Sequence, residues 1–471
     1  MKKGKPSNKK DSLDWYSGIS SIFFSSSFLF YPLVGLLSDV WIGKSTSIAI
    51  GFRLCFIGWI VGGIGYILVY TFEWSVCFWV PFVIAYTLAA FGSSCVHANI
   101  VQYNVDQLIG ASSYKLNTVI YWHCAFAPVA DATLEFLICA ISSDYLTLVS
   151  YIISGVAISI VLISHFYFRH NLETVSLVKN PVKLIVRVLC YARKHKYPEN
   201  RSALTYWEEE APSRLDLGKD KYGGPFTEEE VEDVKTVFRM LPLFIAIIGF
   251  SLIDNPSWDY DSNAELMSCL SETTWGFYTS ISCIMAYAVY LLIVKPCCSR
   301  NTPMLVRIMI GLIFSVSVSL SKLILFSFLQ FNAGLNATLF LIIPQVLVGL
   351  SWALVSPALM TFTVAQAPVH MRGVMVGLMW ASQGIGLLAN ELLIYSFKCI
   401  SHFICTNFYH SLTIGLINFF ILIVFGVFAK RYKYRVRENE VNIVQIVDDH
   451  YQRYIEQEEE YKKSIQNFPV N

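Results

Sequence analysis

Long apolar segments separated by shorter polar connections run through almost the whole chain. A helix that crosses a bilayer needs about 20 mostly apolar residues, and eleven segments of the sequence reach that length. The predicted spans are residues 15–39, 46–71, 76–101, 117–140, 145–168, 236–254, 274–294, 304–330, 336–359, 371–397 and 410–429. This pattern predicts an all-α protein that crosses a membrane many times.

Lysine and arginine lie almost entirely in alternate connections between the predicted spans. The connections after the odd-numbered spans carry them, namely Lys44, Lys115, a cluster within 169–235, Lys295 with Arg300, Arg372 and the run 430–437. Positive charge is retained on the cytoplasmic side of a membrane, so this alternation predicts the orientation of the chain. Among the other connections only the one after the tenth span carries such a residue, Lys398. The five lysines before residue 11 also break the alternation, because the same register places them outside.

A long polar stretch divides the predicted spans into a group of five and a group of six. We predict a basic tail at 1–14, an N-terminal helix bundle at 15–168, a cytoplasmic linker at 169–235, a C-terminal bundle at 236–430 and a charged cytoplasmic tail at 431–471. Two bundles joined in this way are typical of transporters with a site between their halves.

Composition excludes several classes of protein. Hydrophobic residues make up 55% of the chain and charged residues 15%, with a net charge of +1, which leaves too little polar surface for a soluble protein of this length. No basic patch with interleaved aromatic residues indicates a nucleic-acid partner. The spans contain neither a nucleophile beside a base nor a histidine cluster, so we expect no enzyme and no cofactor.

The turn after the first span combines glycines with charged residues. Gly35 and Asp39 end the span, and Gly43 and Lys44 follow in the connection. Glycine permits a tight turn and a close approach of helices, and Asp39 could pair with Lys44 across a gate that opens and closes. We therefore predict a gate at these two charged residues.

Further motifs follow in order along the chain, namely His97-Ala-Asn99-Ile with Asp106-Gln107, Pro212-Ser-Arg-Leu-Asp216, Tyr222-Gly-Gly-Pro-Phe-Thr227, Val231-Glu-Asp-Val-Lys235 and Gln366-Ala-Pro368 with Met371-Arg372-Gly373. Together with the turn at Asp39, they resemble the proton-dependent oligopeptide transporter family of the major facilitator superfamily. Within this family, the motifs most resemble those of animal peptide and histidine transporters. The resemblance implies a major facilitator fold, with two helix bundles that rock around a central cavity.

The resemblance also gives an expectation for the start of the chain. The first predicted span matches the second helix of the family, so we expect the family's first helix to be absent. With that helix would go the Glu-x-x-Glu-Arg motif that carries proton coupling in the family. The expectation accounts for the N-terminal lysines that break the charge alternation.

Several positions that face the family's cavity carry other residues in this sequence. His97 matches a lysine of the fourth helix, Tyr121 and Trp122 match an aromatic pair of the fifth, and Ser351 with Trp352 stands where the tenth has a glutamate. A lone histidine in a span can equally be a packed, hydrogen-bonded side chain. The resemblance gives as candidate substrate-binding residues His97, Asn99, Tyr121, Trp122, Trp352 and Asn255.

Charged residues inside spans are costly and are therefore functional candidates. Asp131 and Glu135 are four residues apart and share one face of the fourth predicted span. Together with His97 they are our candidate proton-coupling residues, and the alternative for the two acids is an ion pair between helices with Arg53. Lys322 and Glu391 are expected to form a structural ion pair or to extend separately toward the membrane surface.

Small and aromatic residues of the tenth predicted span complete the candidates. We expect Gly373, Gly377, Gly384 and Gly386 to allow close helix contact, and the alternative is a bend used in gating. Trp380 is a candidate for the wall of the cavity, although aromatic residues in membrane helices also serve as packing or interface anchors.

We therefore expect a secondary active transporter that moves a di- or tripeptide or an amino acid by alternating access, with proton symport implied by the family. Its partners would be this small organic solute, protons and the lipid bilayer, with no nucleic acid. The plasma membrane or an endolysosomal membrane is the expected location. The alternative is a non-transporting membrane sensor or scaffold derived from such a transporter.

Overall fold

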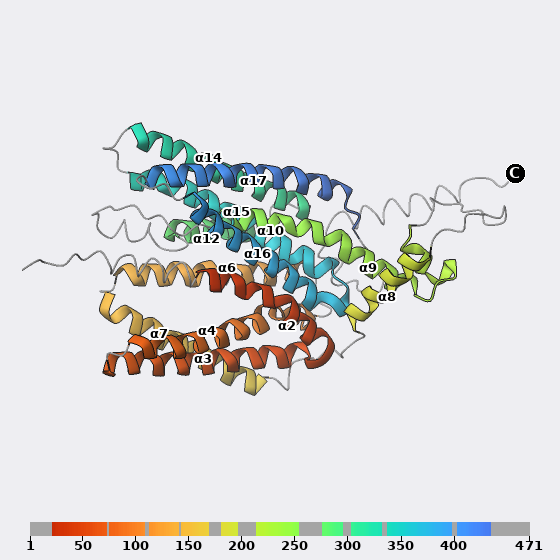
Figure 1. Ribbon diagram of the computed structural model, residues 1–471, viewed down its shortest axis with the longest axis horizontal. Coiled ribbons are helices and arrows are strands. Elements are labelled where there is room, and N and C mark those ends of the chain that lie inside the picture. Colours follow the sequence, from red (N-terminus) through yellow and green to blue (C-terminus); the bar gives the residue numbers. More distant parts are fainter. Residues whose placement is uncertain are drawn as a thin grey trace, which may run out of the picture.

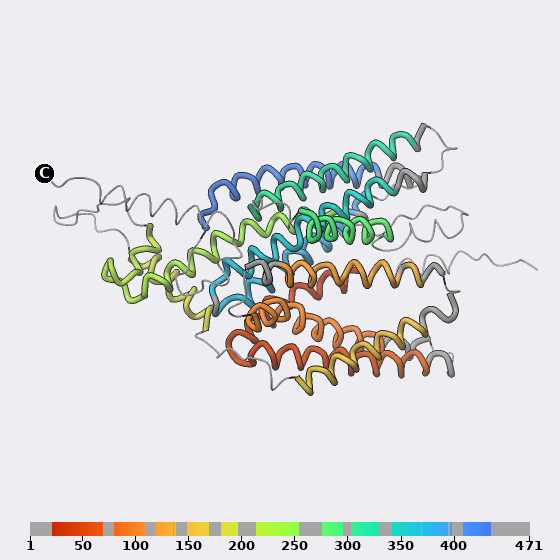
Figure 2. Tube along the Cα trace, turned by 180° about the vertical axis from the view of Figure 1, so that it is seen from behind, coloured from red at the N-terminus to blue at the C-terminus, as the bar shows by residue number. Residues whose placement is uncertain are grey.

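A computed structural model describes the protein over residues 21–72, 75–108, 113–140, 143–168, 180–195, 213–253, 276–294, 303–331, 337–397 and 403–434. The described residues fold into helices that run side by side along the longest axis of the molecule (Figure 1). Residues before the linker form one bundle and residues after it form another, and the two bundles lie next to each other (Figure 2). We call the end that carries the linker the linker end.

The N-terminal bundle contains the helices that precede the linker. In chain order they are η1 (Phe28–Phe30), α2 (Tyr31–Leu37), η2 (Ser38–Ile42), α3 (Lys44–Phe72), α4 (Ser75–His97), α5 (Ile100–Asp106), α6 (Ser113–Ala140) and α7 (Ser143–Phe168). The π-helical η2 ends at Gly43, whose φ of 83° allows the sharp turn into α3. Only glycine adopts such a φ at no steric cost.

The C-terminal bundle contains the helices that follow the linker. They are η5 (Leu241–Phe244), α10 (Ile245–Ser251), α12 (Phe277–Val289), η6 (Tyr290–Val294), α14 (Met304–Phe331), α15 (Ala337–Gln366), η7 (Val369–Met371), α16 (Arg372–Ser396) and α17 (Phe403–Arg431). Buried side chains of α10, α14, α15 and α16 form a continuous core in this bundle. Phe250, Ile308 and Phe362 are each at most 1% exposed.

The described part of the linker is a small folded unit at one end of the bundles (Figure 1). It contains α8 (Pro181–Lys194), η3 (Asp216–Gly218), η4 (Asp220–Tyr222) and α9 (Glu228–Met240), which leads directly into the C-terminal bundle. Thr227 and Glu230 close a reciprocal capping box at the start of α9, which satisfies two backbone N–H groups of the helix end.

Charged side chains hold the linker unit together. The Lys219 ammonium lies 2.8 Å from Glu232 and 3.0 Å from Asp216, and Lys235 also pairs with Asp216. Burial by itself would raise the pKa of Asp216, but hydrogen bonds from Lys235, Ser213 and Lys219 outweigh it and hold that pKa well below its usual range. These carboxylates raise the pKa of Lys219 despite its burial.

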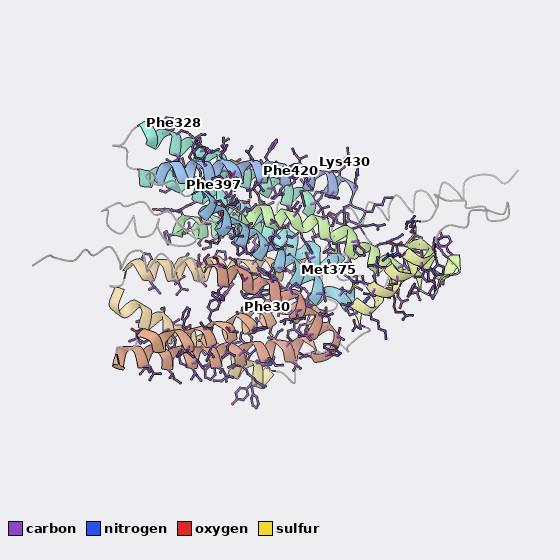
Figure 3. All side chains as sticks on the ribbon, in the orientation of Figure 1. Phe30, Phe328, Met375, Phe397, Phe420 and Lys430 are labelled. Atoms are coloured by element: carbon purple, nitrogen blue, oxygen red, sulfur yellow. The ribbon has the colours of Figure 1, made fainter. Side chains whose placement is uncertain are left out.

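The predicted spans all correspond to helices, and nine helices among the described residues are long and apolar enough to cross a membrane. Outward-facing apolar side chains such as Phe328 and Phe420 are 62% and 64% exposed (Figure 3), which suits contact with lipid tails. The two predicted spans outside the nine are α6 and α16. Their polar residues are explained by their position, because both helices form the contact between the bundles.

Candidate functional site

The first contact between the bundles is a seam between α2, with η1 before it, and α16. Glycines line the α16 side. A Cβ atom added to Gly377 would lie 2.6 Å from the carbonyl oxygen of Tyr31, and one added to Gly384 would lie 2.8 Å from that of Ser25. Carbon atoms pack at roughly 3.5–4.0 Å, so only glycine permits helices this close. The close helix contact predicted for Gly377 and Gly384 is confirmed.

Asp39 closes this seam at the linker end. Its side chain is 8% exposed and accepts a hydrogen bond 3.0 Å long from the backbone N–H of Val374. Val374 lies in the first turn of α16, where backbone N–H groups lack helical partners and carry a partial positive charge. The Asp39 carboxylate therefore joins the end of the α2 segment to the start of a helix in the other bundle.

In this structure the direct partner of Lys44 is Asp106 and not Asp39, and the predicted gate at Asp39 and Lys44 stays a prediction. The Lys44 ammonium lies 2.6 Å from Asp106, and the Arg372 guanidinium of the other bundle lies 3.9 Å from the same carboxylate. Asp106 is closer to Lys44 in the fold because α5 ends beside the start of α3, while the N-terminus of α16 engages Asp39. The two predicted gate residues lie at one end of the seam but have different partners.

Asn99 is packed inside the N-terminal bundle. Its residue is 0% exposed, and its amide nitrogen donates to Ser47 Oγ at 3.1 Å. Its amide oxygen accepts hydrogen bonds from Ser38 and Gln102. These contacts tie η2, α3 and α5 together. Asn99 was predicted to bind substrate, but in this structure its polar atoms are occupied by the protein and none faces the interface.

His97 lies between the two bundles. Its ring stacks on Tyr31 of α2 with centroids 6.3 Å apart and planes within 7°, and it lies 5.6 Å from the ring of Trp380 on α16. The residue is nevertheless exposed. The ring of His97 thus contacts an aromatic side chain of each bundle. His97 is therefore placed where a solute between the bundles could reach it.

The predicted aromatic pair of α6 is split between two environments. Tyr121 is 3% exposed, and its hydroxyl oxygen accepts a hydrogen bond 2.7 Å long from Arg307 of α14. Trp122 is 63% exposed and shares a helix face with Phe126, which is 74% exposed. Consecutive helical residues point in different directions, so the pair does not form one wall. Tyr121 belongs to the contact between the bundles.

The two candidate residues of α15, Ser351 and Trp352, lie within the C-terminal bundle. Trp352 is 7% exposed, and its ring lies 4.9 Å from that of Phe250. Ser351 is 0% exposed and donates to the carbonyl oxygen of Gly311 at 2.8 Å. Both side chains pack against neighbouring helices, so the prediction that Trp352 contacts substrate receives no support from this arrangement. Asn255 lies outside the described residues.

The second contact between the bundles is the seam between α6 and α12. Asp131 of α6 is partly exposed and accepts a hydrogen bond 2.9 Å long from Ser280 of α12. Asp131 is thus a carboxylate at the interface, and its predicted role in proton coupling stays a prediction. The side chain of Glu135 is outside the described part of the chain, so the predicted acid pair stays a prediction.

The remaining charged residues of the spans have separate environments. Glu391 accepts a hydrogen bond 2.6 Å long from Ser21, which joins the bundles at the end opposite the linker. Lys322 is 9% exposed within the C-terminal bundle. The pairing predicted for Lys322 and Glu391 stays a prediction.

Sequence reasoning missed Arg307, which contacts the other bundle. A usable signal was present, because an arginine in the first turn of a membrane helix lies at the positive end of the helix dipole. It also missed the role of Asp106 as the shared partner of Lys44 and Arg372. Helices that are distant in sequence bring these residues together.

The fold and the interface between the bundles define the class of protein. Two bundles with apolar outer surfaces meet along seams that hold carboxylates, basic side chains and an exposed histidine, which is the architecture of a secondary transporter. The POT family model PTR2 matches residues 136–404, which is more than half of the chain. The chain belongs to the POT family. Membership favours secondary transport over the sensor or scaffold alternative.

Solved structures show the same fold at low sequence identity. An auto-inhibited POT family peptide transporter is 16% identical with a TM-score of 0.64, and the match covers 94% of this chain and 93% of that one. The POT family transporter PepTSo is 16% identical with a TM-score of 0.62, covering 88% and 90%. A bacterial homologue of the iron transporter ferroportin is 12% identical with a TM-score of 0.54, covering 88% and 89%. These likenesses establish the major facilitator fold.

Proposed function

We propose that this POT-family transporter carries a small peptide or amino acid through the space between its bundles. The observation that carries the proposal is His97, whose exposed ring lies between Tyr31 of the N-terminal bundle and Trp380 of the C-terminal bundle. A solute held there touches both bundles, as alternating access requires. In support, a mutant peptide transporter POT has been crystallised with alafosfalin, with a TM-score of 0.54 to this chain.

The charges at the interface suit a solute that bears both an ammonium and a carboxylate. An imidazolium at His97 would accept the carboxylate, and Asp131 would accept the ammonium. With a helix rise of 1.5 Å per residue, His97 and Asp131 lie at levels roughly 13 Å apart along the membrane axis. An extended tripeptide spans roughly 10 Å, so a solute longer than one amino acid fits this separation best.

The same two residues serve as the proposed proton-coupling groups, with Glu135 as a third. Histidine and carboxylate side chains inside a membrane protein can take up and release a proton as their surroundings change. Proton symport itself comes from the family resemblance. Movement of solute together with protons toward the cytoplasm is therefore the expected direction of coupling, across the plasma membrane or an endolysosomal membrane.

Uptake by the purified full chain in liposomes tests the proposal. Radiolabelled amino acids, dipeptides and tripeptides are offered with and without an inward proton gradient. We expect tripeptide uptake, reduced at least tenfold in His97→Ala and Asp131→Asn. The matched controls are His195→Ala and Asp220→Asn, because both residues lie in the linker unit outside the bundles.

Full uptake by both interface variants would overturn the assigned roles of His97 and Asp131. Absence of uptake for every solute in the panel would instead contradict the substrate class. Loss of the proton dependence in Asp131→Asn, with uptake down a solute gradient retained, would identify this residue as the coupling group.

A further inference from the structure

A cluster of one arginine and three tyrosines lies at the linker end of the α6–α12 seam. One guanidinium nitrogen of Arg307 donates to the hydroxyl oxygen of Tyr121 at 2.7 Å and to that of Tyr290 at 3.1 Å. The rings of Tyr121 and Tyr290 stack with centroids 4.4 Å apart and planes within 15°. Tyr287 meets Tyr121 edge-on at 6.1 Å. We call Tyr121, Arg307 and Tyr290 the tyrosine–arginine clamp.

Placing the charged Arg307 side chain in this position costs free energy, which the contacts of the clamp must offset. Arginine keeps its charge in proteins, and the Arg307 side chain is buried, with 6% of the residue exposed. It also lies in the first turn of α14, where the helix dipole disfavours a cation. Two phenolic oxygens and the face of the Tyr290 ring, 5.8 Å from the guanidinium carbon, supply the compensating contacts.

The members of the clamp come from different bundles. Tyr121 is carried by α6, whereas Tyr290 is carried by η6 and Arg307 by α14. Any movement that separates the linker ends of α6 and η6 must break the hydrogen bond to Tyr121 and the ring stack together. Contacts between Arg307 and Tyr290 lie within the C-terminal bundle and would survive that movement.

We propose that the tyrosine–arginine clamp holds the linker end of the solute path closed and that it must break in each transport cycle. The clamp would act in parallel with Asp39, which closes the α2–α16 seam at the same end. The two seams use different chemistry, since one binds a helix N-terminus with a carboxylate and the other binds an arginine with neutral phenols. The proposal rests on alternating access and not on the identity of the solute.

A native cysteine reports the opening of this seam. Cys283 lies on α12 one helical turn before Tyr287, and it is 0% exposed. It lies near Cys124, which α6 supplies from the other bundle. A water-borne maleimide should therefore reach Cys283 only when α6 and α12 separate. Cys55 and Cys95, on α3 and α4 within the N-terminal bundle, serve as internal controls.

The test measures alkylation rates in the full-length protein, reconstituted without solute and mapped by mass spectrometry of the cysteine peptides. Tyr121→Phe keeps the ring and removes the acceptor, so we expect Cys283 to react about tenfold faster, the factor that one hydrogen bond to a charged group supplies. Arg307→Gln should accelerate the reaction further. Arg307→Lys, which keeps the charge but lacks the planar fork, should fall between wild type and Arg307→Gln.

The matched control is Tyr66→Phe, which removes a hydroxyl from a side chain of α3 that is 48% exposed and should leave all rates unchanged. A Cys283 rate that stays within about twofold of wild type in both Tyr121→Phe and Arg307→Gln overturns the clamp. So does an equal acceleration at Cys55 and Cys95, because the variants would then loosen the whole protein. Since no solute is used, failure of this test leaves the proposed substrate class untouched.

Discussion

Replacing Gly377 by alanine should separate the two bundles and destabilise the protein. The added Cβ atom would lie 2.6 Å from the carbonyl oxygen of Tyr31 and 2.7 Å from the backbone of Pro32. Because both contacts are with backbone atoms, no rotamer change relieves them, and α2 and α16 must move apart. Restoring an ordinary contact of roughly 3.5 Å requires a displacement of almost 1 Å.

The magnitude follows from overpacking. Forcing an extra carbon into a packed interface costs about 1–3 kcal/mol, whereas alanine gains up to about 1 kcal/mol over glycine in helix propensity. The expected net loss is therefore up to about 2 kcal/mol. At about 2–4 °C per kcal/mol for a unit of 150–250 residues, this loss lowers the midpoint of thermal unfolding by several degrees.

The matched control is Gly426→Ala in α17, where an added Cβ atom meets nothing within 4 Å. This variant gains the helix propensity without the clash, so its unfolding midpoint should equal or exceed that of wild type. Thermal unfolding of both purified variants, followed by tryptophan fluorescence, gives the comparison. A Gly377→Ala protein as stable as Gly426→Ala would refute the glycine seam.

Three further predictions follow from single contacts. Asp39→Asn removes the charge at the start of α16 and should weaken the contact between Asp39 and the Val374 N–H by about 0.3–2 kcal/mol. Alkylation of the thiol in Val374→Cys should then become faster. An unchanged alkylation rate would contradict this prediction. Asn99→Ala leaves buried partners such as Ser47 unsatisfied and should cost about 1–3 kcal/mol in thermal unfolding, whereas full stability with weakened solute binding would favour the original substrate role. Asp216→Asn should destabilise the linker unit. Because the folded-state pKa of Asp216 is lowered, its contribution is fully present above the ordinary pKa of about 4 and is lost as the pH falls toward the lowered value. Protease resistance of the linker at neutral pH should therefore be lower in Asp216→Asn than in wild type, with the gap narrowing in acid.

The sequence predicted the helices and their grouping because those features depend on local composition. Continuous apolar stretches define membrane helices, and the polar run before residue 236 separates two bundles. The capping box at Thr227 and Glu230 is readable from four residues, and the seam glycines Gly377 and Gly384 are readable from their helical spacing. Each of these features is encoded within one helix or one turn.

Spacing along the sequence does not predict which side chains the individual site residues contact. Asp39 and Lys44 are close along the chain, yet Lys44 pairs with Asp106, which lies more than 60 residues later. Tyr121 meets Arg307 only because two helices from different bundles converge at the linker end. The sequence shows only that Asn99 is a polar residue in a predicted membrane helix. Its burial in the fold decides whether the side chain contacts solute or packs against the protein.

The most direct test of alternating access is the distance between the bundles in the presence and absence of solute. Nitroxide labels at Phe166→Cys and Phe428→Cys, on outward-facing positions of α7 and α17 that are 68% and 43% exposed, report the linker end by pulsed electron resonance. Labels at Leu148→Cys and Tyr409→Cys, which are 47% and 51% exposed, report the opposite end. We predict that a transported tripeptide changes the two distances in opposite directions. If the label distance at each end stays the same with every solute, at every pH and in every clamp variant, the account is contradicted.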